Sequence, residues 1–101
     1  MGKARIVVSG DRDLATLIPC FLDNRRQDVW IIKEAMAHAD YERIRILGHS
    51  IKGSGGGYGF ETITELGAQI ESAATAGDRL QIMRALELLK DYLERVHVVY
   101  E

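Results

Sequence analysis

The sequence is short of cysteine, of long apolar runs and of any excess of one charge, and each shortage excludes a class of protein. Cys20 is the only cysteine among 101 residues, so no internal disulfide can form and we do not expect a cysteine-based metal site. No apolar run approaches the roughly 18–20 residues that a membrane-spanning helix requires, and the chain begins without a signal peptide. We therefore expect a cytoplasmic protein with no membrane insertion.

The sequence also lacks a large excess of charge of either sign. Lysine and arginine number 13 and aspartate and glutamate 15, which gives a formal net charge of -2. A surface for nucleic acid or for an anionic membrane needs a basic excess, so we expect no nucleic-acid partner. A chain of 101 residues has room for a single domain.

What the sequence does contain is the periodicity of amphipathic helices. Apolar residues recur every three or four positions over about 18–38. Pro19 suits the first turn of this helix, where its missing N–H is no loss. Asp40 is a good N-cap for a second helix, and the apolar stripe of that helix continues through the glycine-rich segment to Tyr58. Two long helices are therefore predicted in the first half of the chain.

Two further helices are predicted in the second half. Thr62 and Glu65 have capping-box spacing at the start of a third helix, which runs to about residue 76 and ends at Gly77. Asp78 opens a fourth helix, whose apolar stripe continues to about residue 98.

Short connections between long helices favour antiparallel neighbours. The predicted fold is therefore all-α, an antiparallel up-down-up-down four-helix bundle over residues 14–101. Residues 4–8 are a short β-prone run that ends at Ser9-Gly10-Asp11. We interpret residues 1–13 as a short extended N-terminal arm beside the bundle.

Glycine is concentrated in one segment, because six of the ten glycines fall in residues 48–59. Each glycine inside a helix costs about 0.8–1.0 kcal/mol relative to alanine, so the five in residues 53–59 lower the local helix propensity by about 4–5 kcal/mol. Such a penalty indicates that something approaches the backbone closely. A flexible loop is one alternative. A nucleotide site is not favoured, because Lys52-Gly53-Ser54 reverses the Walker order and the glycine spacing does not fit G-x-G-x-x-G.

His49 is the candidate reactive residue. It lies about 140° from the centre of the buried stripe at 100° per residue, which places it on the solvent face. Lys52, Gly53 and Arg45 are three or four residues away and share that face. An exposed imidazole is mostly neutral above pH 7 and offers a nitrogen lone pair, which a phosphoryl acceptor needs. Gly53 and Gly56 leave a floor without side chains, on which a second protein could approach.

The run His49-Ser-Ile-Lys-Gly-Ser-Gly-Gly-Gly-Tyr-Gly59 resembles the signature of histidine-containing phosphotransfer (HPt) domains. That signature is His, any residue, apolar, Lys, Gly, two small residues, two free positions, an aromatic or apolar residue and Gly, and every fixed position matches. The likeness extends over about residues 14–95 and includes Asn24-Arg25-Arg26 in the first helix. Leu66-Gly67 and Ile70-Glu71 resemble the third-helix pattern of the family.

The resemblance implies a covalent phosphoryl carrier rather than an enzyme. By this resemblance His49 would be the phospho-acceptor, Lys52 its electrostatic partner and Gly53 a clearance residue. Helix geometry, and not the resemblance, adds Gly56, Arg45 and the exposed Ile46 as docking contacts for the receiver. The phosphoryl group would come from a receiver-domain aspartyl phosphate or a sensor or hybrid histidine kinase, and would pass to a response-regulator receiver. No cofactor of its own is implied, because the acidic cluster and Mg²⁺ belong to the receiver. We expect a monomer.

Two alternatives remain open. The chain could be the phosphotransfer domain of a chemotaxis-type kinase, which the resemblance associates with a further histidine in the third helix. Residues 68–76 contain none, so the relay is favoured. It could also be a passive helical protein-interaction module in which His49 stays unphosphorylated.

Overall fold

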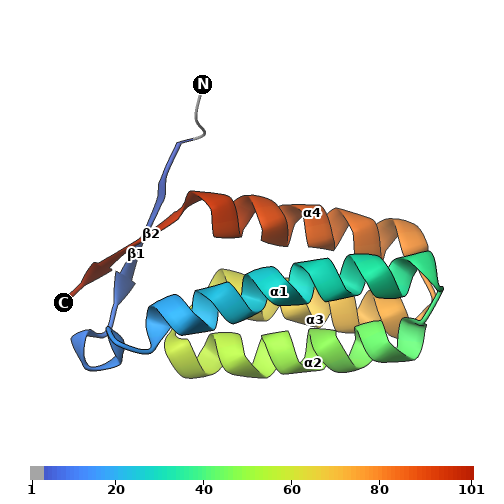
Figure 1. Ribbon diagram of the computed structural model, residues 1–101, viewed down its shortest axis with the longest axis horizontal. Helices are drawn as coiled ribbons and strands as arrows, with labels where there is room; N and C mark the ends of the chain where they lie inside the picture. Colours follow the sequence, from blue (N-terminus) through green and yellow to red (C-terminus); the bar gives the residue numbers. More distant parts are fainter. Residues whose placement is uncertain (1–3) are drawn as a thin grey trace.

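The computed structural model describes residues 4–101, and residues 1–3 of the predicted arm lie outside this range. Its helices and strands are, in chain order, β1 (Ile6–Gly10), a short 3-10 turn (Arg12–Leu14), α1 (Ile18–Ala37), α2 (Tyr41–Tyr58), α3 (Glu61–Thr75), α4 (Arg79–Arg95) and β2 (Val96–Tyr100). The four predicted helices are thus confirmed. They lie side by side along the long axis, and each begins near the end of the bundle at which the previous one ended (Figure 1).

Several predicted helix boundaries are confirmed by their hydrogen bonds. The carboxylate of Asp40 accepts the Arg43 N–H at 3.2 Å at the start of α2, and Asp78 accepts the Gln81 N–H at 3.2 Å at the start of α4. Gly77 follows the end of α3 with a φ of 64°, a left-handed conformation that glycine adopts without steric cost.

The capping box predicted from Thr62 and Glu65 is wrong. The helix α3 already begins at Glu61, and Phe60 occupies the N-cap position without a side-chain hydrogen bond to the first turn. Thr62 therefore lies inside the helix, where its side chain cannot cap the start. Burial of the Phe60 ring, which is 1% exposed, places this residue at the corner between α2 and α3.

The prediction of an all-α fold is corrected by a two-stranded parallel sheet. The helix α4 ends at Arg95 rather than near residue 98, and Val96 is extended. Ile6 pairs with Val96 and Gly10 with Tyr100, so residues 6–10 of the predicted N-terminal arm form a strand of this sheet. The run Val-His-Val-Val-Tyr favours an extended backbone, but its hydrogen-bonding partner lies at the other end of the sequence and helical periodicity gives no sign of it.

Aliphatic side chains from all four helices fill the core. The largest fully buried side chains are Phe60, Ile18, Ile32, Ile44, Ile51, Ile63, Ile70, Ile82 and Leu89. In α2 the predicted stripe is buried at Ile44, Gly48, Ile51 and Gly55. Because α2 continues without interruption to Tyr58, the alternative of a flexible glycine-rich loop is wrong.

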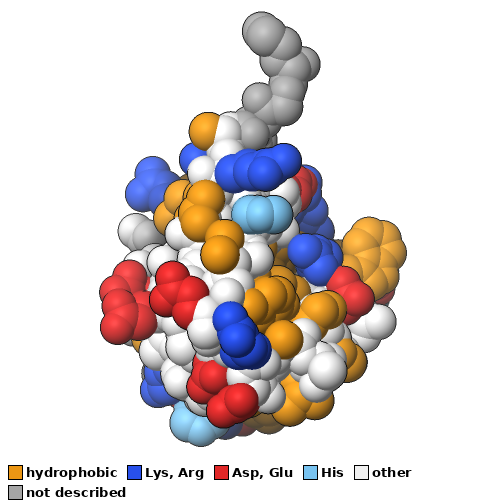
Figure 2. Space-filling model, turned by 90° about the vertical axis from the view of Figure 1, so that its left-hand side faces the viewer, with side chains coloured by type: hydrophobic (Ala, Val, Ile, Leu, Met, Phe, Trp, Pro, Cys, Tyr) orange, Lys and Arg blue, Asp and Glu red, His pale blue; other side chains and the backbone are white. Residues whose placement is uncertain are grey.

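The surface mixes charges of both signs. Figure 2 shows acidic, basic and apolar side chains interspersed on the end of the molecule that carries the strands. Within residues 4–101, no helix combines the length and apolar character that crossing a membrane would require.

Candidate functional site

The helices α2 and α3 approach each other closely because glycines face each other at their contact. A Cβ atom built on Gly48 would lie 2.6 Å from the backbone nitrogen of Glu71, and one built on Gly67 would lie 2.9 Å from the carbonyl oxygen of Gly48. Real Cβ atoms do not approach backbone atoms so closely, so neither position accepts a side chain without moving a helix. The short separation brings polar side chains of α3 within reach of the exposed face of α2.

Glu71 of α3 lies between His49 and Lys52 of α2 and binds both. Its Oε2 is 2.8 Å from His49 Nδ1, and its Oε1 accepts a hydrogen bond of 2.7 Å from Lys52 Nζ. The His49 side chain is 67% exposed, whereas that of Glu71 is only 21% exposed. One carboxylate therefore orients the imidazole while leaving most of the ring in solvent.

The electrostatics of Glu71, His49 and Lys52 determine which ring nitrogen of His49 carries the proton in the neutral ring. The hydrogen bond from Lys52 lowers the pKa of Glu71, the hydrogen bond with His49 lowers it further, and partial desolvation opposes both. Glu71 is therefore ionised at neutral pH and can only accept a hydrogen bond. His49 Nδ1 must then carry the proton, and in the neutral ring the lone pair is on Nε2.

The glycines predicted as a bare floor do lie beside this histidine. A Cβ atom on Gly53 would meet nothing within 4 Å, and one on Gly56 would meet only Thr64 Oγ1 at 3.8 Å. Gly53 is one turn beyond His49 and Gly56 two turns beyond it on the same face. The helix surface that follows the imidazole is thus free of side chains at Gly53 and Gly56.

The other two predicted docking residues, Ile46 and Arg45, differ in whether their side chains are available to a partner. Ile46 is 54% exposed and lies one turn before His49, as expected for a contact on this face. Arg45 forms a two-point ion pair with Glu42, at 3.0 Å and 2.6 Å. Its guanidinium is therefore held by its own helix rather than directed at the imidazole.

The glycine-rich half of α2 is held in place by α1. Arg25 donates a hydrogen bond to Ser54 Oγ and pairs with Asp28 at 2.7 Å, and both charged side chains are largely buried. Burial raises the pKa of Asp28, and the charge of Arg25 opposes this increase. One turn further along, the rings of Phe21 and Tyr58 stack with their centroids 4.5 Å apart. These contacts compensate for the low helix propensity of the glycines.

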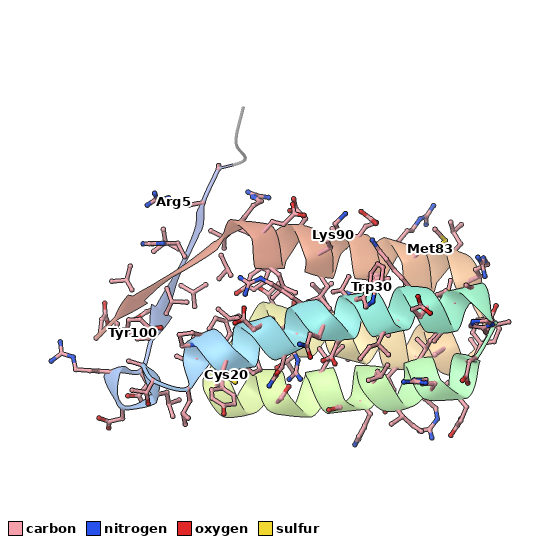
Figure 3. The ribbon with its side chains drawn as sticks, in the orientation of Figure 1. Arg5, Cys20, Trp30, Met83, Lys90 and Tyr100 are labelled. Atoms are coloured by element: carbon pink, nitrogen blue, oxygen red, sulfur yellow. The ribbon has the colours of Figure 1, made fainter. Side chains whose placement is uncertain are left out.

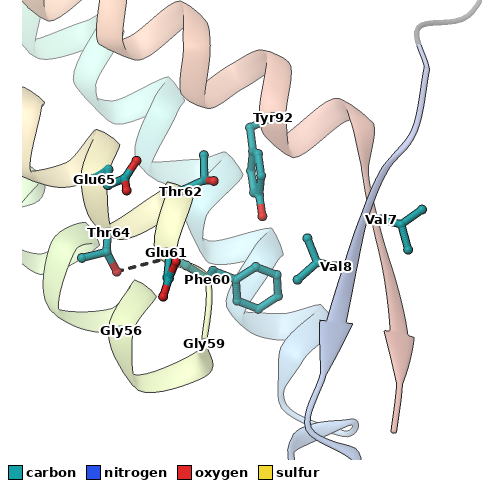
Figure 4. Close-up of a pocket in the computed structure, with 10 residues that line it drawn as sticks. All are labelled: Val7, Val8, Gly56, Gly59, Phe60, Glu61, Thr62, Thr64, Glu65 and Tyr92. Atoms are coloured by element: carbon teal, nitrogen blue, oxygen red, sulfur yellow. Dashed lines mark hydrogen bonds between the residues drawn. The ribbon is translucent and has the colours of Figure 1, made fainter.

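A cavity of the structure lies away from the histidine. It has a volume of about 780 Å³ and is bordered by β1, the start of α3 and Tyr92 of α4 (Figure 4). Gly56 lies on its border, but none of His49, Lys52 and Glu71 does. Among residues 4–101 no group of three His, Cys, Asp or Glu side chains could hold a metal ion. The candidate site around His49 therefore lies on the open face of α2 and not in this cavity.

Glu71 is the residue of the candidate site that the sequence did not identify. The pair Ile70-Glu71 matches the third-helix pattern of the family, but nothing in the local sequence assigns the carboxylate to His49. The missing information is the close α2–α3 contact, which depends on Gly48 and Gly67 lying opposite each other. A search for small residues at the core positions of both helices would have given that signal.

A comparison with protein-family models supports the same conclusion. The model described as the Hpt domain matches residues 16–98, which includes α1 to α4 and most of the chain. Neither a curated protein nor a solved structure matches the chain. Hpt domains are phosphocarrier modules that interact with kinases and response regulators in two-component signalling. The resemblance carried by residues 49–59 is confirmed, and the chain belongs to the Hpt domain family.

Proposed function

We propose that this chain relays a phosphoryl group on Nε2 of His49. The donor is the aspartyl phosphate of a receiver domain or a sensor or hybrid histidine kinase, and the acceptor is the aspartate of a response-regulator receiver. The observation that supports this most directly is the ionised Glu71 carboxylate on Nδ1, which leaves Nε2 unprotonated and exposed.

The chemistry needs little from the chain beyond this orientation. The Nε2 lone pair forms the P–N bond as the P–O bond to the donor aspartate breaks, and the donor leaves as a carboxylate. The proton on Nδ1 stays in its hydrogen bond to Glu71, whose negative charge balances the positive charge that develops on the ring. Transfer to the acceptor is the reverse of this step at a second aspartate.

Lys52 and Gly53 would help a receiver domain to bind at His49. The Lys52 side chain is 37% exposed, and its ammonium beside Glu71 adds positive charge where phosphoryl oxygens arrive. Gly53 leaves open space next to the imidazole, which allows the loops of a receiver to descend on His49. The acidic cluster and Mg²⁺ that assist the transfer are assigned to the receiver.

The test is transfer from a receiver domain that carries a radiolabelled aspartyl phosphate. We expect the chain to acquire a label that is labile to acid and stable to base, in a ratio of one per chain, while His49→Gln acquires none. Parallel incubation with ATP and a histidine kinase distinguishes a kinase donor from a receiver donor. If neither donor labels the wild type and both bind it, the chain is a passive interaction module. A cytoplasmic location and a monomeric state stay predictions, for cell fractionation and sedimentation to test.

A further inference from the structure

We propose that the groove between α1 and α4 binds an acidic peptide segment through an apolar anchor residue, on the side of the bundle opposite His49. The helices contact each other in a ring, α1 with α2, α2 with α3, α3 with α4 and α4 with α1. His49 and Glu71 lie where α2 meets α3. The groove lies where α1 meets α4, so a segment bound there would leave the histidine accessible.

The groove has the form of a site for a side chain. Its volume is about 260 Å³, which is below the range of about 300–1,000 Å³ that is typical of sites for whole small molecules. Val29 and Leu93, which are buried, provide an apolar floor. Trp30 forms one wall although the residue is 66% exposed. Exposed tryptophans beside an apolar floor are typical of residues that dominate the binding energy of protein interfaces.

The rim of the groove is basic, and this determines the chemistry of the occupant. Lys33 of α1 and Lys90 of α4 line it, and Figure 3 shows Trp30 on α1 below Lys90 on α4. In the part of the chain that the structure describes, the side chain of neither lysine forms a hydrogen bond or an ion pair. Arg26 adds a third positive charge, although it is engaged with Asp23 at 2.6 Å, and Glu94 is the one acidic lining residue.

This positive rim is a local feature of a chain whose net charge is -2. An anionic membrane would require a broad and predominantly basic surface, whereas here a few lysines surround a concave apolar floor. Carboxylates on both sides of a large apolar side chain match this arrangement in charge and in shape. An acidic peptide segment is therefore the occupant that the groove favours.

Trp30 makes the proposal directly measurable, because it is the only tryptophan of the chain. Random peptides displayed on phage are selected on the full chain, and the enriched sequences are synthesised and titrated while Trp30 emission is followed. We expect acidic peptides with one large apolar residue, and a blue shift of the emission on binding. The double variant Lys33→Glu/Lys90→Glu should weaken binding at least about tenfold.

Matched controls separate the groove from the rest of the surface. Arg84→Glu changes a basic residue of α4 outside the groove, and Leu88→Ala removes an exposed apolar side chain of α4. Both variants, and His49→Gln, should bind the selected peptides as the wild type does. Trp30→Ala should remove binding measured by calorimetry while its circular dichroism melt stays unchanged.

Four outcomes would overturn the proposal. These are a failure to enrich any peptide, enrichment of peptides without acidic residues, affinity that the lysine reversals leave unchanged, and a blue shift induced by phosphatidylglycerol vesicles or by raising the concentration of the chain alone. The vesicle result would point to a membrane surface, and the concentration result to a second copy of this chain.

Discussion

His49 Nδ1 and Glu71 Oε2 lie 2.8 Å apart, across the contact between two helices that are adjacent in sequence. Orientation of a histidine by a carboxylate on its second nitrogen is a common way to fix the tautomer of a reactive imidazole. Here the carboxylate in turn accepts a hydrogen bond of 2.7 Å from Lys52, so His49, Glu71 and Lys52 form one hydrogen-bonded unit. The first two predictions concern this unit.

Replacing Glu71 with glutamine should slow phosphoryl transfer to His49 by about three- to tenfold, equivalent to about 0.7–1.4 kcal/mol in the barrier. The amide keeps the shape of the side chain but not its charge, so it no longer fixes the proton on Nδ1 or balances the positive ring. Single-turnover transfer measures the rate, and ¹⁵N chemical shifts of the imidazole report the tautomer. Glu65→Gln, on the exposed surface of the same helix, is the control and should change neither.

The contribution of Glu71 to the stability of the domain should be present at neutral pH and lost at acidic pH. Its pKa in the folded chain is lowered from 4.5, chiefly by the hydrogen bond from Lys52. A carboxyl with a lowered folded pKa stabilises the fold above its unfolded pKa and loses this contribution as the pH falls through the folded value. Urea unfolding of the wild type and Glu71→Gln should therefore converge as the pH falls below about 4.5. A constant difference between pH 7 and pH 3 would contradict the ionised state of Glu71.

Alanine substitutions at Gly53 of α2 and Gly67 of α3 should change the stability of the fold in opposite directions. Gly67→Ala should destabilise the fold by about 1–3 kcal/mol, because the new methyl group would overlap the backbone of α2 at Lys52 and Gly48. Gly53→Ala should instead stabilise it by up to about 1 kcal/mol, because the space is open and alanine favours the helix. Urea melts give both values, and equal effects would mean that the α2–α3 contact is looser than described.

Gly53→Gln should separate stability from function. Gly53 is helical, its φ is not positive and nothing lies within 4 Å of the added Cβ, so the fold should tolerate glutamine. Transfer should fall at least about tenfold, because the long side chain stands where the donor must approach His49. The reacting atoms of the donor and of His49 must come within the near-attack distance of roughly 3–3.5 Å. A thermal melt beside single-turnover transfer measures both. Transfer at the wild-type rate would show that Gly53 has no clearance role.

The features that could be predicted from the sequence depend on neighbours within a turn or two. The cap at Asp40 and the exposure of His49 follow from helical geometry alone, so both agree with the structure. Glu71 could not be assigned, because its link to His49 depends on the approach of a second helix. The end of α4 was wrong for the same kind of reason, since Val96 leaves the helix to pair with Ile6 at the other end of the chain.

The pairing of β1 with β2 depends on the folded helical bundle, whereas the bundle does not depend on this pairing. A two-stranded sheet is at best marginal by itself, and parallel strands need a long crossover, which here is the entire bundle. The strands can meet only after the helices have brought α4 and the chain before α1 together, so they belong late in folding and early in local opening. Amide protons of residues 96–100 should exchange well before those of Ile44 or Ile51. The bundle can stay folded while the strands separate, but the strands cannot stay paired once the bundle unfolds.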